Sequence, residues 1–427
     1  MATSEKPKST GGAGLDLVSV IRNSGILSER QLSDLRARIL SGDLPTAAPA
    51  LAERLVDSRL LTEYQAKRLL ANKPHGLTVG KYVILDRIGS GSMGRVFKAH
   101  HQLMGRVVAL KIIAPEILTN ERALARFQRE MRLVGRLDHP GVVRAFDADQ
   151  VNGVSYIVME YVQGRSLGQI YKSEGVFAPV DVVSYGVQAA RGLAHAHAQG
   201  VVHRDIKPSN LMLNEEKQVK VLDLGLGVLM EADNQATFAT ADGIAVGTVD
   251  YMSPEQASGK EVDGRTDLYS LGCAMYHLVS GRLPFPGDSP IERLGKRING
   301  RPVPLQEARA DLPPGFIRVM DKLLAHHPKD RYQSGTEAAD ALESLLRRST
   351  KKAVPAPVAP PADAEPATVV SQQPRQIVEV EVYPEYPAWF RPLAELAETR
   401  PKTALTLLLG SAAACIGLGT LLGWAAF

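Results

Sequence analysis

A short polar stretch between positions 203 and 225 holds the residue types that phosphoryl transfer needs. Asp205 lies two residues before Lys207 and five before Asn210, and Asp223 follows thirteen residues after the asparagine. A carboxylate can orient an attacking hydroxyl and accept its proton, while a lysine can steady the transferred phosphate. Amide and carboxylate oxygens are ligands that Mg²⁺ prefers. The spacing therefore predicts Asp205 and Lys207 as catalytic residues and Asn210 and Asp223 as magnesium ligands.

A glycine-rich loop upstream supplies what a nucleotide phosphate requires. Gly89, Gly91 and Gly94 are spaced G-x-G-x-x-G, and glycines let the backbone turn tightly and present bare N–H groups to phosphate oxygens. The same spacing opens a dinucleotide-binding Rossmann unit, but there a helix follows the loop. Here residues 95–99 and 107–113 have the pattern of two strands. We therefore reject the Rossmann interpretation in favour of a strand–loop–strand hairpin that covers phosphates.

Lys111 stands in the apolar second strand of this hairpin, where an ammonium is costly unless it is paired. Nineteen residues later, Glu130 lies in the stretch 125–134, whose apolar residues recur at helical spacing. We expect the two side chains to pair and to aim Lys111 at the phosphates of a nucleotide. The alternative is a plain surface salt bridge, and the glycine-rich loop in front argues against it.

Together these motifs resemble the signature set of protein kinases. The chain is similar to the bacterial Hanks-type Ser/Thr protein kinases over roughly residues 82–346. The resemblance implies an α+β, bilobal protein-kinase fold, with a small β-rich N-lobe and a large helical C-lobe. It implies an enzyme of bacterial signalling that transfers the γ-phosphoryl of ATP, with Mg²⁺, to Ser or Thr hydroxyls of proteins. Asp205 would then be the catalytic base, and Asn210 and Asp223 would hold the magnesium.

The same resemblance implies a set of residues around the nucleotide. Lys111 and Glu130 would orient the phosphates, adenine would bind the backbone of residues 160–162, and Met159 would lie at the back of the pocket. The full set is Ile88, Gly89, Ser90, Gly91, Ser92, Met93, Gly94, Val96, Ala109, Lys111, Glu130, Met159, Glu160, Val162 and Met212.

Two motifs depart from the family pattern. The metal-binding triplet at 223–225 has Leu224 where the family has Phe, and we expect this leucine to pack against the helix that carries the lysine's partner. The family's Ala-Pro-Glu motif has Ser at its first position, residues 253–255, and Glu255 is expected to pair with Arg331. Both changes keep the chemistry that the motifs serve.

The resemblance also assigns a structural role to Asp267, whose carboxylate would hold the backbone of the turn at 203–205. His195 and His197 precede that turn on an expected helix. Because no third ligand stands at a suitable spacing, we interpret these histidines as packing or surface residues rather than as a metal site.

Substrate preference and regulation follow from the residues around the expected activation segment. Lys207 is the family's mark of Ser/Thr preference, and Thr248 would touch it; alternatively, Thr248 is a turn residue that uses its hydroxyl locally. Arg204 is the cation that a phosphothreonine would recruit. We predict autophosphorylation at Thr237 or Thr240 that raises activity, with a solvated, unregulated loop as the alternative. Thr248 is a third candidate phosphosite.

The composition sets the class of protein. A length of 427 residues allows two or three domains, and a net charge of +4 with dispersed basic residues predicts no nucleic-acid partner. Only two cysteines are present, so no disulfide framework is expected, as suits a reducing cytoplasm. The rival to an active enzyme is a pseudokinase that serves as a membrane-bound scaffold. Lys111, Asp205 and Asp223 are all present, which favours the enzyme.

Residues 15–75 predict a small helical module with a weak internal repeat at an offset of 34. In one copy Ser28 precedes Gln31 by three residues, and in the other Thr62 precedes Gln65 by three. Each pair fits the capping box that starts a helix. Two copies are too few for a solenoid. A module for protein interaction or regulation and a structural extension of the kinase both remain open.

Four further segments flank these domains. Residues 1–14 are polar, lack the apolar core of a secretory signal and are expected to be disordered. Residues 347–388 form a Pro/Ala-rich linker, and residues 389–402 form a juxtamembrane segment. Residues 403–427 contain no charge. As a helix they would span ~37 Å, enough to cross a hydrocarbon core of ~30 Å.

We expect this last span to be a transmembrane helix, because a buried soluble helix would show polar residues along one face. Arg391, Arg400 and Lys402 precede it, which predicts a single-pass protein of the inner (cytoplasmic) membrane with the kinase on the cytoplasmic side. Gly419 and Gly423 form a small-residue face that leaves a homodimer open.

Overall fold

The computed structural model describes residues 12–91, 93–118, 120–225 and 249–352. Ser92 and the candidate phosphosites Thr237, Thr240 and Thr248 lie outside this part of the chain. So does the chain from residue 353 on, whereas residues 347–352, where the linker is expected to begin, are helical. Within the described residues, no helix has the length and apolar character needed to cross a bilayer. The span expected at 403–427 lies outside them.

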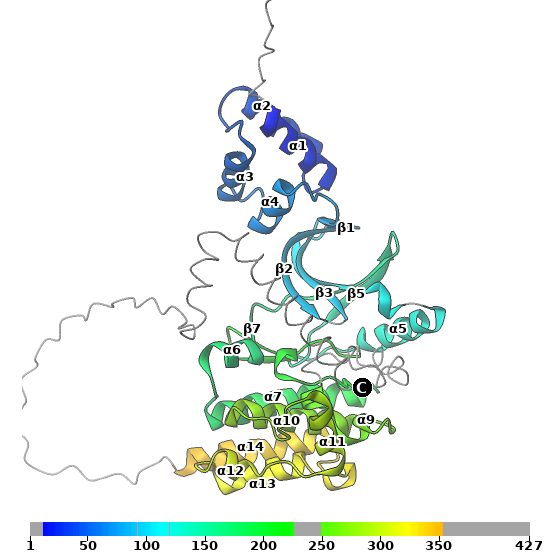
Figure 1. Cartoon of the computed structure of the whole chain (residues 1–427), viewed down its shortest axis with the longest axis vertical. Helices are drawn as coiled ribbons and strands as arrows, with labels where there is room; N and C mark the ends of the chain where they lie inside the picture. Colours follow the sequence, from blue (N-terminus) through cyan, green and yellow to red (C-terminus); the bar gives the residue numbers. More distant parts are fainter. Residues whose placement is uncertain (1–11, 92, 119, 226–248, 353–427) are drawn as a thin grey trace, which may run out of the picture. The chain divides into compact units, whose positions relative to one another are not determined.

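The described chain runs through a helical block, a β-rich block and a second helical block (Figure 1). The helices are α1 (Gly12–Ser24), α2 (Glu29–Leu40), α3 (Ala48–Asp57), α4 (Glu63–Leu70), α5 (Glu121–Val134), α6 (Leu167–Glu174), α7 (Pro179–Ala198), α9 (Pro254–Ala257), α10 (Gly264–Ser280), α11 (Pro290–Asn299), α12 (Leu305–Ala308), α13 (Pro314–Leu323) and α14 (Gly335–Lys352). The strands are β1 (Thr78–Val79), β2 (Tyr82–Gly91), β3 (Gly94–His101), β4 (Arg106–Ile113), β5 (Ala145–Val151), β6 (Val154–Glu160), β7 (Gly164–Ser166), β8 (Leu211–Asn214) and β9 (Val219–Val221). Short 3₁₀ helices span Pro115–Ile117, Pro208–Asn210, Val249–Tyr251 and Pro328–Asp330.

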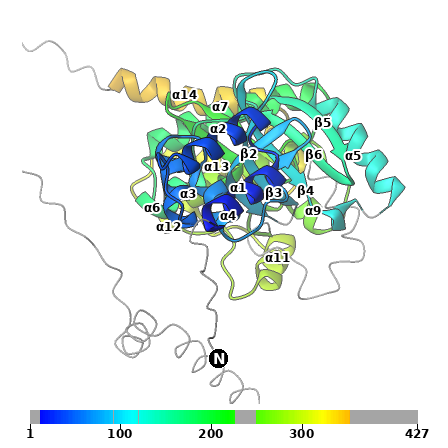
Figure 2. The same cartoon turned by 90° about the horizontal axis from the view of Figure 1, so that it is seen from above.

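The β-rich block is a six-stranded sheet of order β1-β2-β3-β4-β6-β5 whose strand pairs are all antiparallel. Strands β2 and β3 form the hairpin predicted from the glycine loop, so that prediction is confirmed. Two bulges interrupt their pairing, because Leu85 and Ile88 on β2 have no opposite residue on β3. A bulge bends its strand and increases the local twist. Helix α5 lies beside β5 and β6 (Figures 1 and 2).

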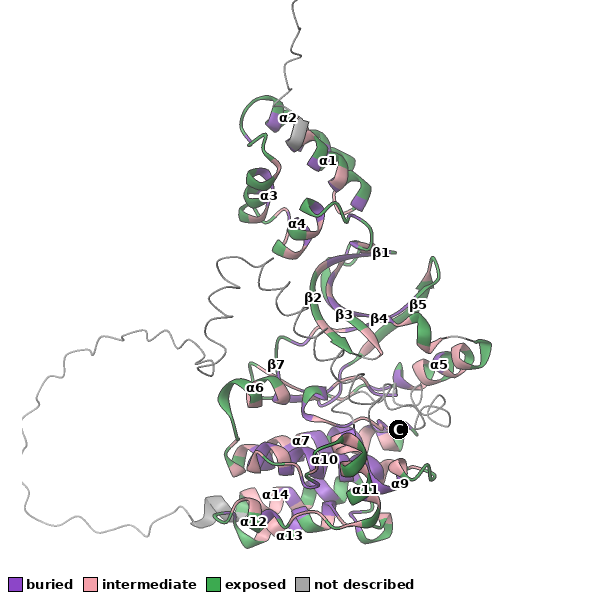
Figure 3. Cartoon of the chain, in the orientation of Figure 1, coloured by how far each residue is buried: buried purple, intermediate pink, exposed green. Residues whose placement is uncertain are grey.

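The second helical block is organised around α10, which is buried on nearly every side (Figure 3). A helix that is apolar all round belongs in the centre of a core, and α7 and α13 pack against it while α14 lies along α7. The shared core includes Leu193, Leu268, Tyr276 and Met320, which are fully buried. The predicted kinase fold, a β-rich N-lobe followed by a helical C-lobe, is therefore confirmed.

Four helices, α1 to α4, form the N-terminal module around their own apolar core, which includes Val18, Leu51 and Leu77. Both predicted capping boxes are confirmed. The Ser28 hydroxyl accepts from the Gln31 N–H at the start of α2, and the Thr62 hydroxyl accepts from the Gln65 N–H at the start of α4. In each box the glutamine side chain accepts from the backbone N–H of the capping residue.

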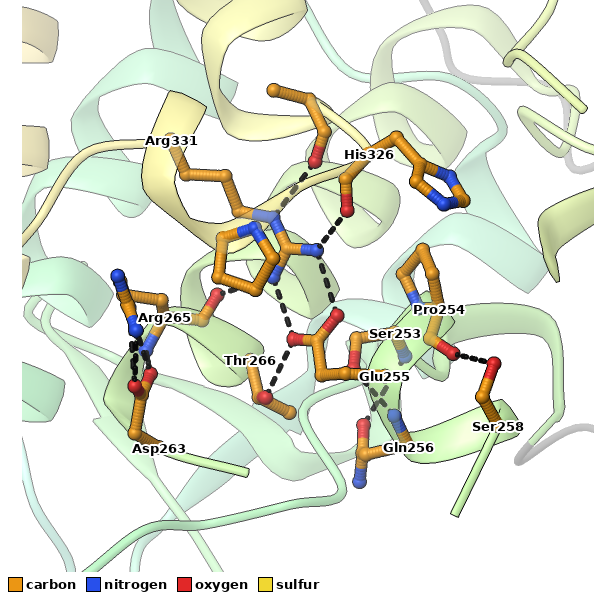
Figure 4. A network of polar contacts seen from close by, with 12 residues as sticks. Ser253, Pro254, Glu255, Gln256, Ser258, Asp263, Arg265, Thr266, His326 and Arg331 are labelled. Atoms are coloured by element: carbon orange, nitrogen blue, oxygen red, sulfur yellow. Dashed lines mark hydrogen bonds and ion pairs between the residues drawn. The ribbon is translucent and has the colours of Figure 1, made fainter. Parts of the chain in front are cut away.

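A buried ion pair fixes the chain soon after residue 249, where the last described range begins (Figure 4). Arg331 donates from both terminal nitrogens to the Glu255 carboxylate, at 2.7 and 2.8 Å, which confirms the predicted pair. Thr266 donates to the same carboxylate at 2.7 Å. Burial by itself would raise the pKa of Glu255, but the Arg331 guanidinium outweighs it and holds the pKa low. Removing one partner of such a pair costs about 3–5 kcal/mol, because the other charge stays buried.

Candidate active site

The catalytic loop gathers three of the predicted residues around one carboxylate. Lys207 donates from Nζ to Asp205 Oδ2 at 2.8 Å. Asn210 donates from Nδ2 to the Asp205 carbonyl at 2.8 Å and to Oδ2 at 3.3 Å. Asn210 ends the 3₁₀ turn that begins at Pro208, which brings its side chain back toward Asp205. The loop thus places an ammonium and an amide within hydrogen-bond distance of the same carboxylate.

Asp267, on α10, holds the backbone of this loop. Its carboxylate is fully buried and accepts from the His203 and Arg204 backbone N–H groups, each at 2.8 Å. These bonds confirm the structural role predicted for Asp267. Burial by itself would raise the pKa of Asp267, but the hydrogen bond to His197 and the neighbouring histidines outweigh burial and lower that pKa.

Lys111 and Asp223 form an ion pair at 2.8 Å between Nζ and Oδ2. The predicted pair between Lys111 and Glu130 is therefore wrong for this structure. Lys111 projects from the middle of β4 and is 5% exposed, so a carboxylate must compensate its charge. Asp223, the predicted magnesium ligand, supplies it here. Burial by itself would raise the pKa of Asp223, but the Lys111 ammonium more than offsets this and keeps the pKa below its usual range.

Glu130 instead faces the turn after Asp223. Its Oε2 lies 3.7 Å from the point where a side chain at Gly225 would begin. Burial raises the pKa of Glu130, and the nearby charge of Arg204 partly opposes that shift. Glu130 therefore lies near the Gly225 turn, while Lys111 pairs with Asp223.

Two residues of the site adopt left-handed backbone conformations that side chains disfavour. Arg204 has φ of 67° and Asp223 has φ of 58°. Such conformations persist only where the surroundings over-determine them, and they cluster at functional sites. Leu224, next to Asp223, is buried in the same core cluster as Val134 of α5, as predicted for the departure from the family triplet.

The glycine-rich loop turns between β2 and β3. Gly94 has φ of 135°, and a Cβ there would collide with the carbonyl oxygen of Ile112 on β4. Only glycine permits this close approach of two strands. Gly89, Ser90 and Gly91 continue β2, while Ser92 lies outside the described residues.

Six of the residues predicted to surround the nucleotide come together in one apolar cluster. Ala109, Met159 and Val162 are buried there, and Met93, Val96 and Met212 pack against them half-buried. Ile88 does not join this cluster, because it is 41% exposed at the second bulge of β2. Glu160 closes the end of β6 and pairs with Lys220 at 2.9 Å. The cluster provides an apolar wall of the kind that a planar base requires.

The donor set fits a magnesium ion. Asn210 uses Nδ2 for both of its side-chain hydrogen bonds to Asp205, which leaves the amide oxygen available as a ligand. Asp223 offers a second oxygen. Among the described residues no group of three or more His, Cys, Asp or Glu side chains forms a metal site. One or two protein oxygens completed by substrate phosphates is the arrangement that Mg²⁺ prefers.

Two contacts of the site were missed by the sequence interpretation. His197 Nε2 lies 2.7 Å from Asp267 Oδ2, so this histidine braces the carboxylate that holds the catalytic loop. Lys220 neutralises Glu160 at the nucleotide pocket. Each pair joins residues 60 or more positions apart, so no local sequence spacing could have predicted the contact.

A family model for the protein kinase domain matches residues 82–344. This is more than half of the chain. The chain belongs to the protein kinase family.

Curated bacterial relatives of this chain are named serine/threonine-protein kinases. It is 39% identical over 306 residues to a probable serine/threonine-protein kinase of Corynebacterium efficiens, covering 68% of this chain and 46% of the relative. It is 36% identical over 300 residues to the serine/threonine-protein kinase PknB of Mycolicibacterium smegmatis, covering 66% and 47%. The chain therefore spans about half the length of these curated relatives.

A solved structure shows the same fold. The PknI kinase domain of Mycobacterium tuberculosis superposes with a TM-score of 0.52 and 28% sequence identity. The match covers 64% of this chain and 98% of the PknI domain. The N-lobe and C-lobe of the kinase thus have an experimentally determined counterpart.

Replacing Asp267 with asparagine is expected to lower the free energy of unfolding by about 2 kcal/mol at neutral pH, because charge-assisted hydrogen bonds to the loop are lost. The pKa of Asp267 is lowered in the folded state, so its contribution is fully present above the unfolded pKa. It is lost as pH falls through the lower folded pKa, and the gap between wild type and variant should shrink below about pH 5. Urea titrations across pH measure this gap.

The control is Asp16→Asn, which changes an exposed carboxyl of α1. It should leave stability unchanged at every pH. A gap for Asp267→Asn that stays constant down to the acid transition would contradict the assigned role.

Proposed function

We propose that this protein is a Ser/Thr protein kinase that transfers the γ-phosphoryl group of ATP to hydroxyl groups of protein substrates. The observation that carries the proposal is the hydrogen-bonded group of Asp205, Lys207 and Asn210 beside the Lys111–Asp223 pair. It joins a proton acceptor, a cation for the transferred phosphate and two oxygen ligands. The names of the bacterial relatives support the same activity.

In this proposal each side chain has one task. Asp205 orients the substrate hydroxyl and accepts its proton, while Lys207, 2.8 Å from it, neutralises charge on the transferred group. Mg²⁺ held by Asn210 and Asp223 would shield the charge of the nucleotide phosphates. For Asp223 to serve the metal, Lys111 must release it, and Glu130 on α5 is the carboxylate placed to receive the lysine. The Lys111–Asp223 pair therefore belongs to a resting arrangement of the enzyme.

Phosphoryl transfer to a generic basic protein should require both Asp205 and Lys111. We expect Asp205→Asn to lower kcat by about 10²–10⁴-fold, because the general base is removed. Lys111→Met should abolish measurable transfer. Label incorporated from γ-labelled Mg-ATP measures both. Equal labelling by wild type and both variants would refute the roles, and equal absence of label would favour the rival, a pseudokinase scaffold.

We extend the proposal to activation by autophosphorylation at Thr237 or Thr240, which lie outside the described residues. A phosphate there would meet Arg204, which adjoins the base and sits at a strained backbone position. We expect pre-incubation with Mg-ATP to raise the rate of substrate phosphorylation and to modify one of these threonines. Phosphopeptide mass spectrometry identifies the position. Finding both threonines unmodified in fully active enzyme would rule this activation out.

The localisation that we propose is the cytoplasmic membrane, anchored by residues 403–427 with the kinase domain in the cytoplasm. The uncharged length of this segment and the basic residues before it support the proposal. The full chain should sediment with membranes and resist extraction by high salt, whereas a chain ending at residue 402 should remain in the supernatant. Chemical crosslinking of the membrane fraction tests the homodimer suggested by Gly419 and Gly423. Equal partitioning of both chains would exclude the anchor.

A further inference from the structure

One of the two capping boxes in the N-terminal module does more than start its helix. Gln65 of α4 donates from Nε2 to the Ile84 carbonyl of β2 at 2.7 Å. Thr62 donates from Oγ1 to the Leu85 carbonyl at 2.5 Å. Both side chains keep their capping bonds at the same time. Gln65 is 3% exposed, so its amide is committed to these partners.

The two carbonyls belong to the part of β2 where the sheet ladder is interrupted. Strand β1 pairs with β2 at Tyr82 and Val83, and the Leu77 carbonyl accepts from the Ile84 N–H. Beyond that point no strand of the described residues pairs with β2 on this side. Leu85 is also the bulged residue that lacks a partner on β3. Side chains of the module therefore bind two β2 carbonyls that accept no hydrogen bond from a neighbouring described strand. These carbonyls lie at the bulge that bends β2.

Apolar contacts tie the same helix to the hairpin. Tyr64 packs against the module core and also against the N-lobe core, where its ring lies 6.4 Å from that of Phe97 on β3. Successive residues of a strand point to opposite faces. Val96, the neighbour of Phe97, accordingly packs in the cluster expected to surround adenine. The module thus holds one face of the hairpin while the other face lines the nucleotide pocket.

The distance to the phosphate-binding loop is short. Only four positions separate the bulge at Leu85 from Gly89, about 13 Å of strand. A second bulge, at Ile88, lies between the two, so the bend at Leu85 and the glycines belong to one irregular stretch of β2.

The first copy of the repeat forms the same capping box without contacting the kinase sheet. Ser28 and Gln31 form the same capping box at α2, but both residues are exposed. Among the described residues their side chains bond only to each other and to their own backbone. The chain therefore contains a matched pair of boxes, of which one contacts the kinase sheet.

We infer that Thr62 and Gln65 are positioning residues for the glycine-rich strand, and that residues 12–77 preset the loop for ATP. We call the two hydrogen bonds from Thr62 and Gln65 to β2 the clamp. The clamp holds β2 at its bulge, so the nucleotide meets a loop already in its binding shape. This inference rests on the proposed kinase function. Without the clamp the competent shape is populated for a smaller fraction of the time, and the apparent affinity for ATP falls by that fraction.

The sharpest variant is Gln65→Glu. A glutamate can still accept from the Thr62 N–H and keep the helix cap, but it has no N–H to donate to the Ile84 carbonyl. We expect the KM for ATP to rise about tenfold, which corresponds to about 1.4 kcal/mol. The kcat should stay within about twofold, because Asp205 and Lys207 are untouched. The matched control is Gln31→Glu, which should change neither constant.

Variants of Thr62 test the same inference without placing a buried charge, which could unfold the module in Gln65→Glu. Thr62→Ser keeps the hydroxyl and should retain the wild-type KM, whereas Thr62→Ala removes cap and clamp together and should raise it. Ser28→Ala removes only a cap and is the control for Thr62→Ala. Thermal unfolding of each full-length variant verifies that the module is folded.

Titration with a non-hydrolysable ATP analogue gives a dissociation constant that does not depend on turnover. A rise in that constant for Gln65→Glu and Thr62→Ala, but not for the two controls, supports the inference. Equal constants for Gln65→Glu and Gln31→Glu, with both proteins folded, would overturn it. If wild type binds the analogue yet transfers no phosphoryl group, the proposed enzyme function fails while the affinity comparison still decides the positioning role.

Discussion

The buried carboxylate of Asp267 is the constraint on which the catalytic loop depends. It binds two consecutive backbone N–H groups of a turn whose second residue, Arg204, has a left-handed conformation. That conformation is unfavourable for arginine in isolation. The loop therefore keeps its shape because α10, the most enclosed helix of the C-lobe, supplies the compensating acceptor. Gln256 Nε2 also donates to the Arg204 carbonyl at 2.8 Å, and the Leu222 N–H donates to the Asn210 carbonyl at 2.9 Å, so neighbouring segments support the loop as well.

The N-lobe side of the site is held less firmly. Lys111 lies on a rigid strand, but two carboxylates compete for it, Asp223 from the turn below and Glu130 from α5. In the structure Lys111 pairs with Asp223. A buried ammonium is costly without a carboxylate, so Lys111 can release Asp223 only if another acceptor takes its place. In the proposed function that acceptor is Glu130 of α5.

Much of this arrangement could be predicted from the sequence. The hairpin, the two capping boxes, the Glu255–Arg331 pair and the role of Asp267 follow either from local spacing or from the resemblance of ordered motifs to a family. The partner of Lys111 could not be predicted, because spacing places a lysine on a strand and a glutamate on a helix without giving the distance between them. The clamp on β2 was also missed. It depends on a bulge at Leu85, and no residue type at that position marks a bulge.

The duplicated capping box has a consequence for how this protein can change over evolutionary time. Drift at Ser28 or Gln31 weakens one exposed helix start and little else. Drift at Thr62 or Gln65 alters a helix start, a strand edge and the neighbourhood of the phosphate loop together. The two copies of one pattern thus differ in what a substitution disturbs, because only the second copy contacts the kinase sheet.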